Sequence, residues 1–210
     1  PLKHIIILLF IMASHGSAFP IAKLALNNSV PPILMASLRM GIVLILLLPF
    51  WKFKIPEKKY IKSLVLFSAS MGVMVYVFMN LSLKYSNFIS PIIIGSQLAI
   101  PFGVLASAIM LNENISKKKW LFVITAFIGI VIVFFDPDLK NNLLGLFFAT
   151  LMALFFAMAQ VYSRDLRKLN IYLINASTGL FGFFVLMLVS VFIEGNTVNN
   201  IQNINIERSE

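Results

Sequence analysis

The chain has 210 residues, of which 60% are hydrophobic and 12% are charged, and its mean hydropathy is +0.93. This composition excludes a water-soluble globular domain, which would need more polar residues to cover its surface. The formal net charge is +9 at pH 7, but the basic residues lie in short segments between apolar runs, which argues against a nucleic-acid partner. The sequence has no cysteine, so disulfides and thiol chemistry are excluded as well.

Apolar stretches follow one another along the chain, each about long enough to cross a bilayer. A spanning helix needs about 20 mainly apolar residues, because its backbone must satisfy its own hydrogen bonds in hydrocarbon. The seven predicted spans are 4–26, 31–50, 61–80, 88–111, 119–135, 142–162 and 171–193. Residues 2–18 look like a signal peptide, but the apolar run continues to Leu26, so we interpret it as the first helix. The sequence therefore predicts an all-α membrane protein with about seven transmembrane helices.

The charges between the spans predict the orientation. Lysine and arginine gather in every second loop, at 51–60, 112–119 and 163–170. The alternate loops carry far fewer positive charges, at 27–32, 81–87 and 136–141. Because positive loops stay in the cytoplasm, the N-terminus is predicted to be cytoplasmic. The polar tail, 196–210, is expected to be external or disordered.

An internal repeat is visible at an offset of about 140 residues. Phe10 to Arg39 and Phe148 to Gly179 each combine a helix rich in small residues, a basic residue near its end and a polar turn before the next helix. The basic residues in corresponding positions are Lys23 and Arg164. The first helix thus matches the sixth, and a repeat of five helices must be inserted with inverted topology. Inverted repeats are typical of secondary transporters, whose substrate lies near the midplane between the halves.

Several stretches carry a resemblance to a known family. They are His15–Lys23, Pro31–Arg39, Gln97–Pro101 followed by Leu111–Glu113, Gly129, and Gly145–Arg164. Together they resemble the opening and the sixth helix of EamA-type members of the drug/metabolite transporter superfamily, over about residues 5–190. The sequence departs from that family at His15, where a tryptophan is usual, and at Pro20.

The resemblance implies an architecture and an activity. Family members usually have ten helices in two inverted five-helix repeats and export amino acids or related metabolites. On this basis 1–137 is the first repeat, 138–195 is the start of the second, and the chain is part of a ten-helix fold. The expected location is the inner (plasma) membrane of a bacterium, and the expected partners are the lipid bilayer and a small solute. A homodimer is left open.

Arg39 is the most informative polar residue within a predicted span. If the second helix begins at Pro31, a rise of 1.5 Å per residue puts Arg39 about 12 Å deep. An arginine there costs at least ~2.5 kcal/mol on insertion scales, so it must face a cavity or a partner. A planar guanidinium can bind a solute carboxylate bidentately. The alternative is a structural arginine that binds backbone carbonyls or extends to the external face.

Proline beside a polar side chain marks two further candidate sites. Pro101 cannot donate to the carbonyl of Gln97, and Pro20 cannot donate to that of Gly16, next to His15. Interrupted helices in corresponding places point to a transport site. His15 is expected to be a hydrogen-bonding group, with a proton-carrying role as the alternative.

Gln97 is expected to face away from a stripe of small residues. The stripe recurs every four residues, at Pro91, Gly95, Ala99, Gly103 and Ser107. Such a stripe favours close helix packing, so the Gln97 amide should point toward a substrate or a neighbouring helix.

The remaining polar candidates are weaker. Tyr76, Asn80 and Gln160 lie within predicted spans, where a structural role competes with solute binding. No metal or cofactor is expected, because two histidines and no intramembrane carboxylate form no cluster of ligands.

Other classes of function were weighed against transport. The lack of a GxxxxGK[ST] loop argues against an ATP-driven pump, and the lack of an evident partner for His15 in a nucleophile and base pair argues against an intramembrane enzyme. The alternatives left open are a truncated or non-transporting membrane scaffold or sensor, and a carrier of another solute class, such as drugs or nucleotide-sugar-like molecules.

Single cysteines introduced into this cysteine-free chain test the orientation. We expect Lys58→Cys, Lys118→Cys and Lys168→Cys to react with a membrane-impermeant maleimide only from the cytoplasm, since the positive-inside rule places these loops there. Asn28→Cys and Asn141→Cys should react only from outside. Labelling of Lys118→Cys from outside in intact cells would overturn the assignment.

Overall fold

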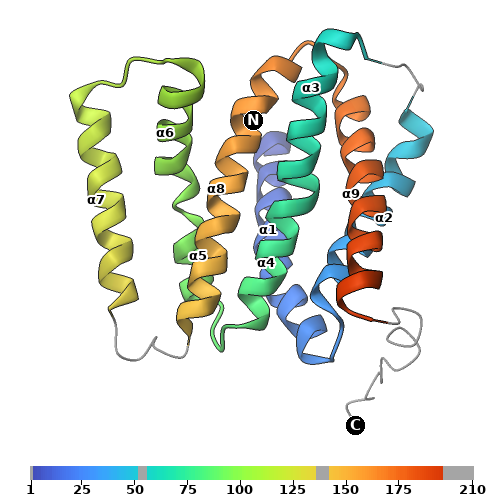
Figure 1. The fold of residues 1–210 in the computed structure, drawn as a ribbon, viewed down its shortest axis with the longest axis horizontal. Helices are drawn as coiled ribbons and strands as arrows, with labels where there is room; N and C mark the ends of the chain where they lie inside the picture. Colours follow the sequence, from blue (N-terminus) through green and yellow to red (C-terminus); the bar gives the residue numbers. More distant parts are fainter. Residues whose placement is uncertain (1, 52–55, 136–141, 196–210) are drawn as a thin grey trace.

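The structure, a computed structural model, describes residues 2–51, 56–135 and 142–195. Over these residues the chain is a bundle of helices without strands (Figure 1). In chain order the helices are α1 (Leu2–Asn27), α2 (Pro32–Leu47), α3 (Lys58–Phe67), α4 (Val75–Lys84), α5 (Ser90–Ser96), α6 (Ala99–Leu111), α7 (Lys117–Phe134), α8 (Leu143–Leu166) and α9 (Ile171–Ile193). A short 3₁₀ turn, η1 (Leu48–Phe50), extends α2, and a π-helical segment, η2 (Ser68–Met74), joins α3 to α4.

Six helical stretches, two of which combine successive α-helices, are long and apolar enough to cross a membrane. The six such stretches are His4–Asn27, Pro32–Phe50, Lys58–Lys84, Ser90–Leu111, Leu143–Leu166 and Ile171–Ile193. They correspond to six of the seven spans predicted from the sequence. The remaining predicted span, 119–135, corresponds to α7. This helix has 18 residues and begins with three lysines, and it is not among the six. The prediction of an all-α membrane fold is confirmed, whereas the predicted tail, 196–210, lies outside the described residues.

Successive spans run in opposite directions, so alternate connections meet at the same end of the bundle (Figure 1). The connections from α6 to α7 and from α8 to α9 lie at the upper end in this view. Lys117–Lys119, at the start of α7, and Arg164–Lys168, around the end of α8, flank these connections, and we call this end the basic end. The turns from α1 to α2 and from α4 to α5 lie at the opposite end, which we call the far end. The fold thus brings basic loops together at one end, which is the pattern that the orientation prediction requires.

Glycines allow α9 to pack closely between α2 and the π segment. A Cβ atom added at Gly179 would lie 3.2 Å from the backbone nitrogen of Leu44 in α2. One added at Gly182 would lie 2.8 Å from the carbonyl oxygen of Gly72 in η2. Small residues let the backbones of membrane helices approach, and van der Waals contact then stabilises the pair. The helix that carries Arg39 is therefore held firmly by α9.

The π segment is a feature that apolar patterning did not predict. Its seven residues, Ser68–Met74, lie in the middle of the third span. Here the backbone of Gly72 touches α9, and the hydroxyls of Ser68 and Thr178 lie 3.1 Å apart in a buried hydrogen bond. A π turn is wider than an α turn and is frequent at functional sites. The π segment therefore rotates α4 relative to α3, and this rotation sets the direction in which Tyr76 points into the interior.

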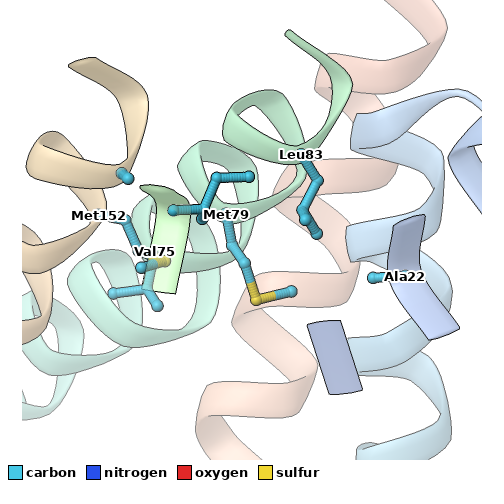
Figure 2. Packing of buried hydrophobic residues seen from close by; sticks show 7 residues of the cluster. Ala22, Val75, Met79, Leu83 and Met152 are labelled. Carbon is cyan, nitrogen blue, oxygen red and sulfur yellow. The ribbon is translucent and has the colours of Figure 1, made fainter. Parts of the chain in front are cut away.

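An apolar cluster fills the space between α1, α4 and α8. Ala22, Val75, Met79, Leu83 and Met152 belong to it and are labelled in Figure 2. The small side chain of Ala22 admits the longer ones from α4, and flexible methionines fill the irregular space that is left. Met79 and Met152 also line the cavity described below, so this core is one wall of the site.

The contact between α9 and η2 can be tested with two glycines that both lie inside long helices but differ in their neighbours. Gly182→Ala should lower stability by about 1–3 kcal/mol, because the new methyl group meets a carbonyl oxygen that cannot move away. Gly129→Ala in α7 is the matched control, since a Cβ there meets nothing within 4 Å. It should be neutral or slightly stabilising, because alanine favours helix. Thermal unfolding of both variants in detergent measures the difference, and equal melting temperatures would contradict the close contact.

Candidate functional site

A cavity of about 450 Å³ lies inside the bundle, where α1, α2, the third span, the α5–α6 junction and α8 meet. Four of the residues predicted from the sequence line it, namely Arg39, Tyr76, Gln97 and Gln160. The other described residues of its lining are mostly apolar: Ala18, Phe19, Met71, Val75, Met79, Ser96, Ala99, Ile100, Met152, Ala153 and Phe156. We call this the central cavity.

Arg39 supplies the charge of the central cavity. It lies two turns into α2, half-buried, and its guanidinium carbon is 4.7 Å from the centre of the Tyr76 ring. A cation over an aromatic face is attracted by the ring quadrupole, and the attraction grows when water is excluded. Among the described residues that line this cavity, Arg39 is the only charged one. The cavity therefore has a positive group with a supporting ring on one side and no carboxylate from its described lining to neutralise it.

Gln97 lies where the fourth span is interrupted. α5 ends at Ser96 and α6 begins at Ala99, and Pro101 is the third residue of α6. The interruption predicted at Pro101 is present, but the carbonyl of Gln97 is not free as expected. It accepts a hydrogen bond of 3.1 Å from the backbone N–H of Ile100, because the chain tightens into a short turn at the break. The group that Gln97 offers to the cavity is its side-chain amide.

The stripe of small residues does not act as one packing seam. Gly95 packs on α8, where an added Cβ would lie 2.9 Å from Leu146 and 3.1 Å from Ala149. At Gly103 an added Cβ meets nothing within 4 Å, and Gly103 and Ser107 line a second cavity. The expectation of continuous packing was wrong beyond the break, because the interruption at Gln97 shifts the helical phase of α6 relative to α5.

Asn80 is placed away from the central cavity. Its side chain is 1% exposed, and its Nδ2 donates a hydrogen bond of 2.8 Å to the carbonyl of Pro32. Asn80 thus joins α4 to the first turn of α2, and it is not among the lining residues of the central cavity. The sequence identified a buried polar residue correctly but could not show that its partner is backbone.

The first helix differs from the prediction at Pro20. α1 runs without interruption from Leu2 to Asn27, with Pro20 inside it on an exposed face. The expected break is absent, since a membrane helix can accommodate the one hydrogen bond that a proline removes. Ala18 and Phe19, just before Pro20, line the central cavity. The side chain of His15 lies outside the described residues.

The second cavity, of about 440 Å³, continues from the central cavity toward the basic end. Ala99, Ile100 and Gln160 line both. Together the two form a groove along α6 and α8, which we call the groove. Near its outer end Arg164 forms a salt bridge with Glu113 and donates a hydrogen bond of 3.1 Å to the Ser107 hydroxyl.

Charged side chains tie helix ends together at the far end. The Glu194 carboxylate, just after α9, accepts hydrogen bonds from the backbone N–H groups of Ile33 at 2.7 Å and Leu34 at 2.9 Å. Lys23 of α1 donates to the carbonyls of Leu83 and Ser86, both at 2.6 Å, where α4 ends. A carboxylate at a helix N-terminus and a lysine at a C-terminus satisfy unpaired backbone groups and match the helix dipole.

These residues were missed as functional partners by the sequence analysis. In the sequence Lys23 stands out only as the repeat counterpart of Arg164, and Glu194 lies just beyond the last predicted span without any signal of its own. Nothing in local spacing predicts that Glu194 reaches a residue 161 positions away. A third cavity, of about 400 Å³, lies beside these ties and shares no lining residue with the groove.

Comparison with known proteins agrees with the resemblance noted in the sequence. No curated protein matches the chain. Residues 2–135, from α1 through α7, match the EamA-like transporter family. The match covers more than half of the chain and includes Arg39, Tyr76 and Gln97. The protein therefore belongs to the EamA-like transporter family.

Proposed function

We propose that the protein is a secondary transporter that exports an amino acid or a similar small solute by alternating access. The observation that carries this proposal is Arg39, a half-buried guanidinium in a cavity of about 450 Å³ whose described lining holds no carboxylate. Burying a cation without a partner is costly, so the arginine is suited to a partner that arrives from outside the fold. Ligand cavities commonly have volumes of about 300–1,000 Å³, a range that includes the central cavity.

The lining suggests which solute fits. The Arg39 fork can donate hydrogen bonds to both oxygens of a carboxylate, and the Tyr76 ring keeps the guanidinium in place while the site is empty. Amide oxygens of Gln97 and Gln160 can accept hydrogen bonds from an ammonium group. The aromatic and methionine side chains on the remaining walls suit an apolar group. This combination favours a zwitterion with an apolar side chain over a large polyanion.

The two ends of the bundle support a state that is open toward the basic end. The groove leads from the basic end to the central cavity through shared lining residues. At the far end, Glu194 and Lys23 hold helix ends together. With the basic end in the cytoplasm of a bacterium, as the positive-inside rule predicts, such a state would load solute from inside and release it outside.

The two helices beyond the family match fit the same proposal. α8 and α9 follow residue 135, and we assign them to the start of a second, inverted repeat over 138–195. Both contribute to the proposed machinery, since α8 lines the groove and α9 holds α2. Movement of one repeat against the other would then alter access to Arg39 from either end. Solute binding that depends on Arg39 distinguishes this proposal from a scaffold that binds no solute.

Removing the guanidinium tests the proposed contact with the carboxylate. After a screen of the twenty L-amino acids by calorimetry, the tightest binder should bind Arg39→Gln at least about tenfold more weakly, because a charged hydrogen bond is lost. Arg39→Lys keeps the charge but loses the fork, so it should give an intermediate affinity. The amide derivative of the same amino acid lacks the carboxylate and should bind parent and Arg39→Gln alike.

Lys62→Gln is the control for loss of charge, because Lys62 is exposed on α3. It should bind the amino acid as the parent does. If both Arg39 variants bind normally, the carboxylate lies elsewhere. If neither variant folds, Arg39 is a structural residue and the proposal fails.

Asn80 should behave in the opposite way. Asn80→Ala leaves the carbonyl of Pro32 without its buried donor, so stability should fall by about 1–3 kcal/mol. Asn80 lies outside the central cavity, so the folded variant should bind the same amino acid with an affinity within about twofold of the parent's. Such a change is smaller than the tenfold change in affinity that corresponds to ~1.4 kcal/mol. Thermal unfolding and calorimetry on one preparation measure both. A large loss of affinity with unchanged stability would contradict this and indicate that Asn80 takes part in solute binding.

A further inference from the structure

The outer part of the groove has the chemistry of an anion site that is distinct from the central cavity. Three cationic side chains line it, Lys119, Arg164 and Arg167, against one carboxylate, Glu113. Its polar lining also includes Asn114, Ser163 and Gln160. The surplus of positive charge lies over a cavity of about 440 Å³, which is a volume suited to a small molecule.

Arg164 shows what such a site recognises. One arm of its guanidinium pairs with a carboxylate oxygen of Glu113, and the other donates to the Ser107 hydroxyl at 3.1 Å. The Glu113 carboxylate is supplied by the segment that follows α6, whereas Arg164 belongs to α8. Glu113 therefore occupies, from within the chain, the position that the carboxylate of a solute would take.

The pair is weak enough for exchange. The side chains of Arg164 and Glu113 are 39% and 49% exposed. Partly exposed ion pairs contribute little, because water and salt compete for both partners. A solute carboxylate near the two further cations of this lining can replace Glu113 without leaving a buried charge unpaired.

The position of Arg164 connects this site to the central cavity. Gln160 lies one turn before Arg164 on the same face of α8, and its side chain lines both parts of the groove. The separation of one turn is about 6 Å along the helix axis. A solute released by Arg164 toward the interior therefore meets Gln160 next, and then Arg39.

We propose that Arg164, Ser107 and Lys119 form an entrance site that binds the carboxylate of the solute in exchange with Glu113, before the solute moves to the central cavity. This inference rests on the proposed function, because it assumes that the groove leads a solute to Arg39. The ligand of the entrance site is a small monocarboxylate, which competes with the Glu113 carboxylate for Arg164.

A thiol placed in the groove can report on the arrival of a carboxylate. Ser163 lines this cavity, and Ser163→Cys provides the only thiol in the chain. Iodoacetate carries a carboxylate, whereas iodoacetamide has the same reactive carbon without the charge. Both alkylate a thiolate with loss of iodide, so the ratio of their rates measures how strongly the site recruits the carboxylate.

In the Ser163→Cys background, Arg164→Gln should lower this ratio about threefold to fivefold, the size of a partly exposed ion pair. Glu113→Gln should raise it, because the competing carboxylate is removed. Lys117→Gln is the matched control: Lys117 is exposed at the same end and is not among the described lining residues, so the ratio should not change. The iodoacetamide rate, which needs no charge, checks that each variant keeps the groove intact.

An unchanged ratio in Arg164→Gln, with the iodoacetamide rate preserved, would overturn the entrance site, and so would a fall in Glu113→Gln. If Arg164→Gln does not fold, two other variants test the entrance site. The rate ratio should rise in Glu113→Gln and should be intermediate in Arg164→Lys. A lipid phosphate is separated by repeating the assay in nanodiscs. If the effect of Arg164→Gln on the rate ratio is lost in phosphatidylglycerol nanodiscs but not in phosphatidylcholine nanodiscs, the site binds a lipid headgroup, and the proposal that it binds the solute is refuted.

The two proposals fail in different ways. If amino acids do not bind at Arg39, calorimetry shows it directly, and the alkylation ratio still tests Arg164. If the entrance site is absent, the ratio is insensitive to Arg164 while calorimetry still responds to Arg39→Gln.

Discussion

The placement of Arg39 depends on the contact between α2 and α9. At the far end, the Glu194 carboxylate holds the first N–H groups of α2, and deeper in the bundle Gly179 of α9 lies against the α2 backbone while Gly182 lies against the Met40 side chain. A helix that enters a membrane with a charge in its middle needs such support, because the cost of that charge favours any movement that brings it to water. Glu194 and the glycines oppose that movement. The central cavity keeps its cation because a neighbouring helix fixes the one that carries it.

The two basic residues that the predicted repeat aligns, Lys23 and Arg164, have unequal partners. Lys23, near the end of α1, binds two carbonyl oxygens where α4 ends, and neither oxygen can leave without unwinding that helix end. Arg164, near the end of α8, binds the side chain of Glu113, which can rotate away. The lysine is thus bound to backbone at the far end, whereas the arginine is bound to a mobile side chain at the basic end.

Much of the architecture could be predicted because the membrane imposes simple rules on sequence. Length and hydropathy gave the spans, since a bilayer sets the number of residues in a helix. The same reasoning led to Arg39, because a costly residue at a known depth needs a reason to be there. Tyr76, Gln97 and Gln160 could be named as polar residues within spans, and the structure brings all three to the cavity of Arg39.

The remaining features depend on distances between helices, which spacing along one helix does not contain. Asn80 and Gln97 looked alike in sequence, yet one binds the carbonyl of Pro32 and the other lines the cavity. Pro20 and Pro101 also looked alike, but only the second lies at an interruption, because α1 continues through Pro20. The π segment lies where α9 approaches Gly72, and the partner of Glu194 depends on how two ends that are distant in the chain meet.

The unequal exposure of the charged contacts has a consequence for how the protein responds to its medium. Arg164 and Glu113 are 39% and 49% exposed, so dissolved ions reach them. At about 0.15 M salt the Debye length is ~8 Å, and a rise in ionic strength screens exposed charges far more than shielded ones. The bonds from Glu194 to α2 are short contacts with backbone groups in a partly buried place. A rise in salt concentration on the side of the basic end would therefore loosen the contact between Arg164 and Glu113, while the bonds of Glu194 at the far end would hold.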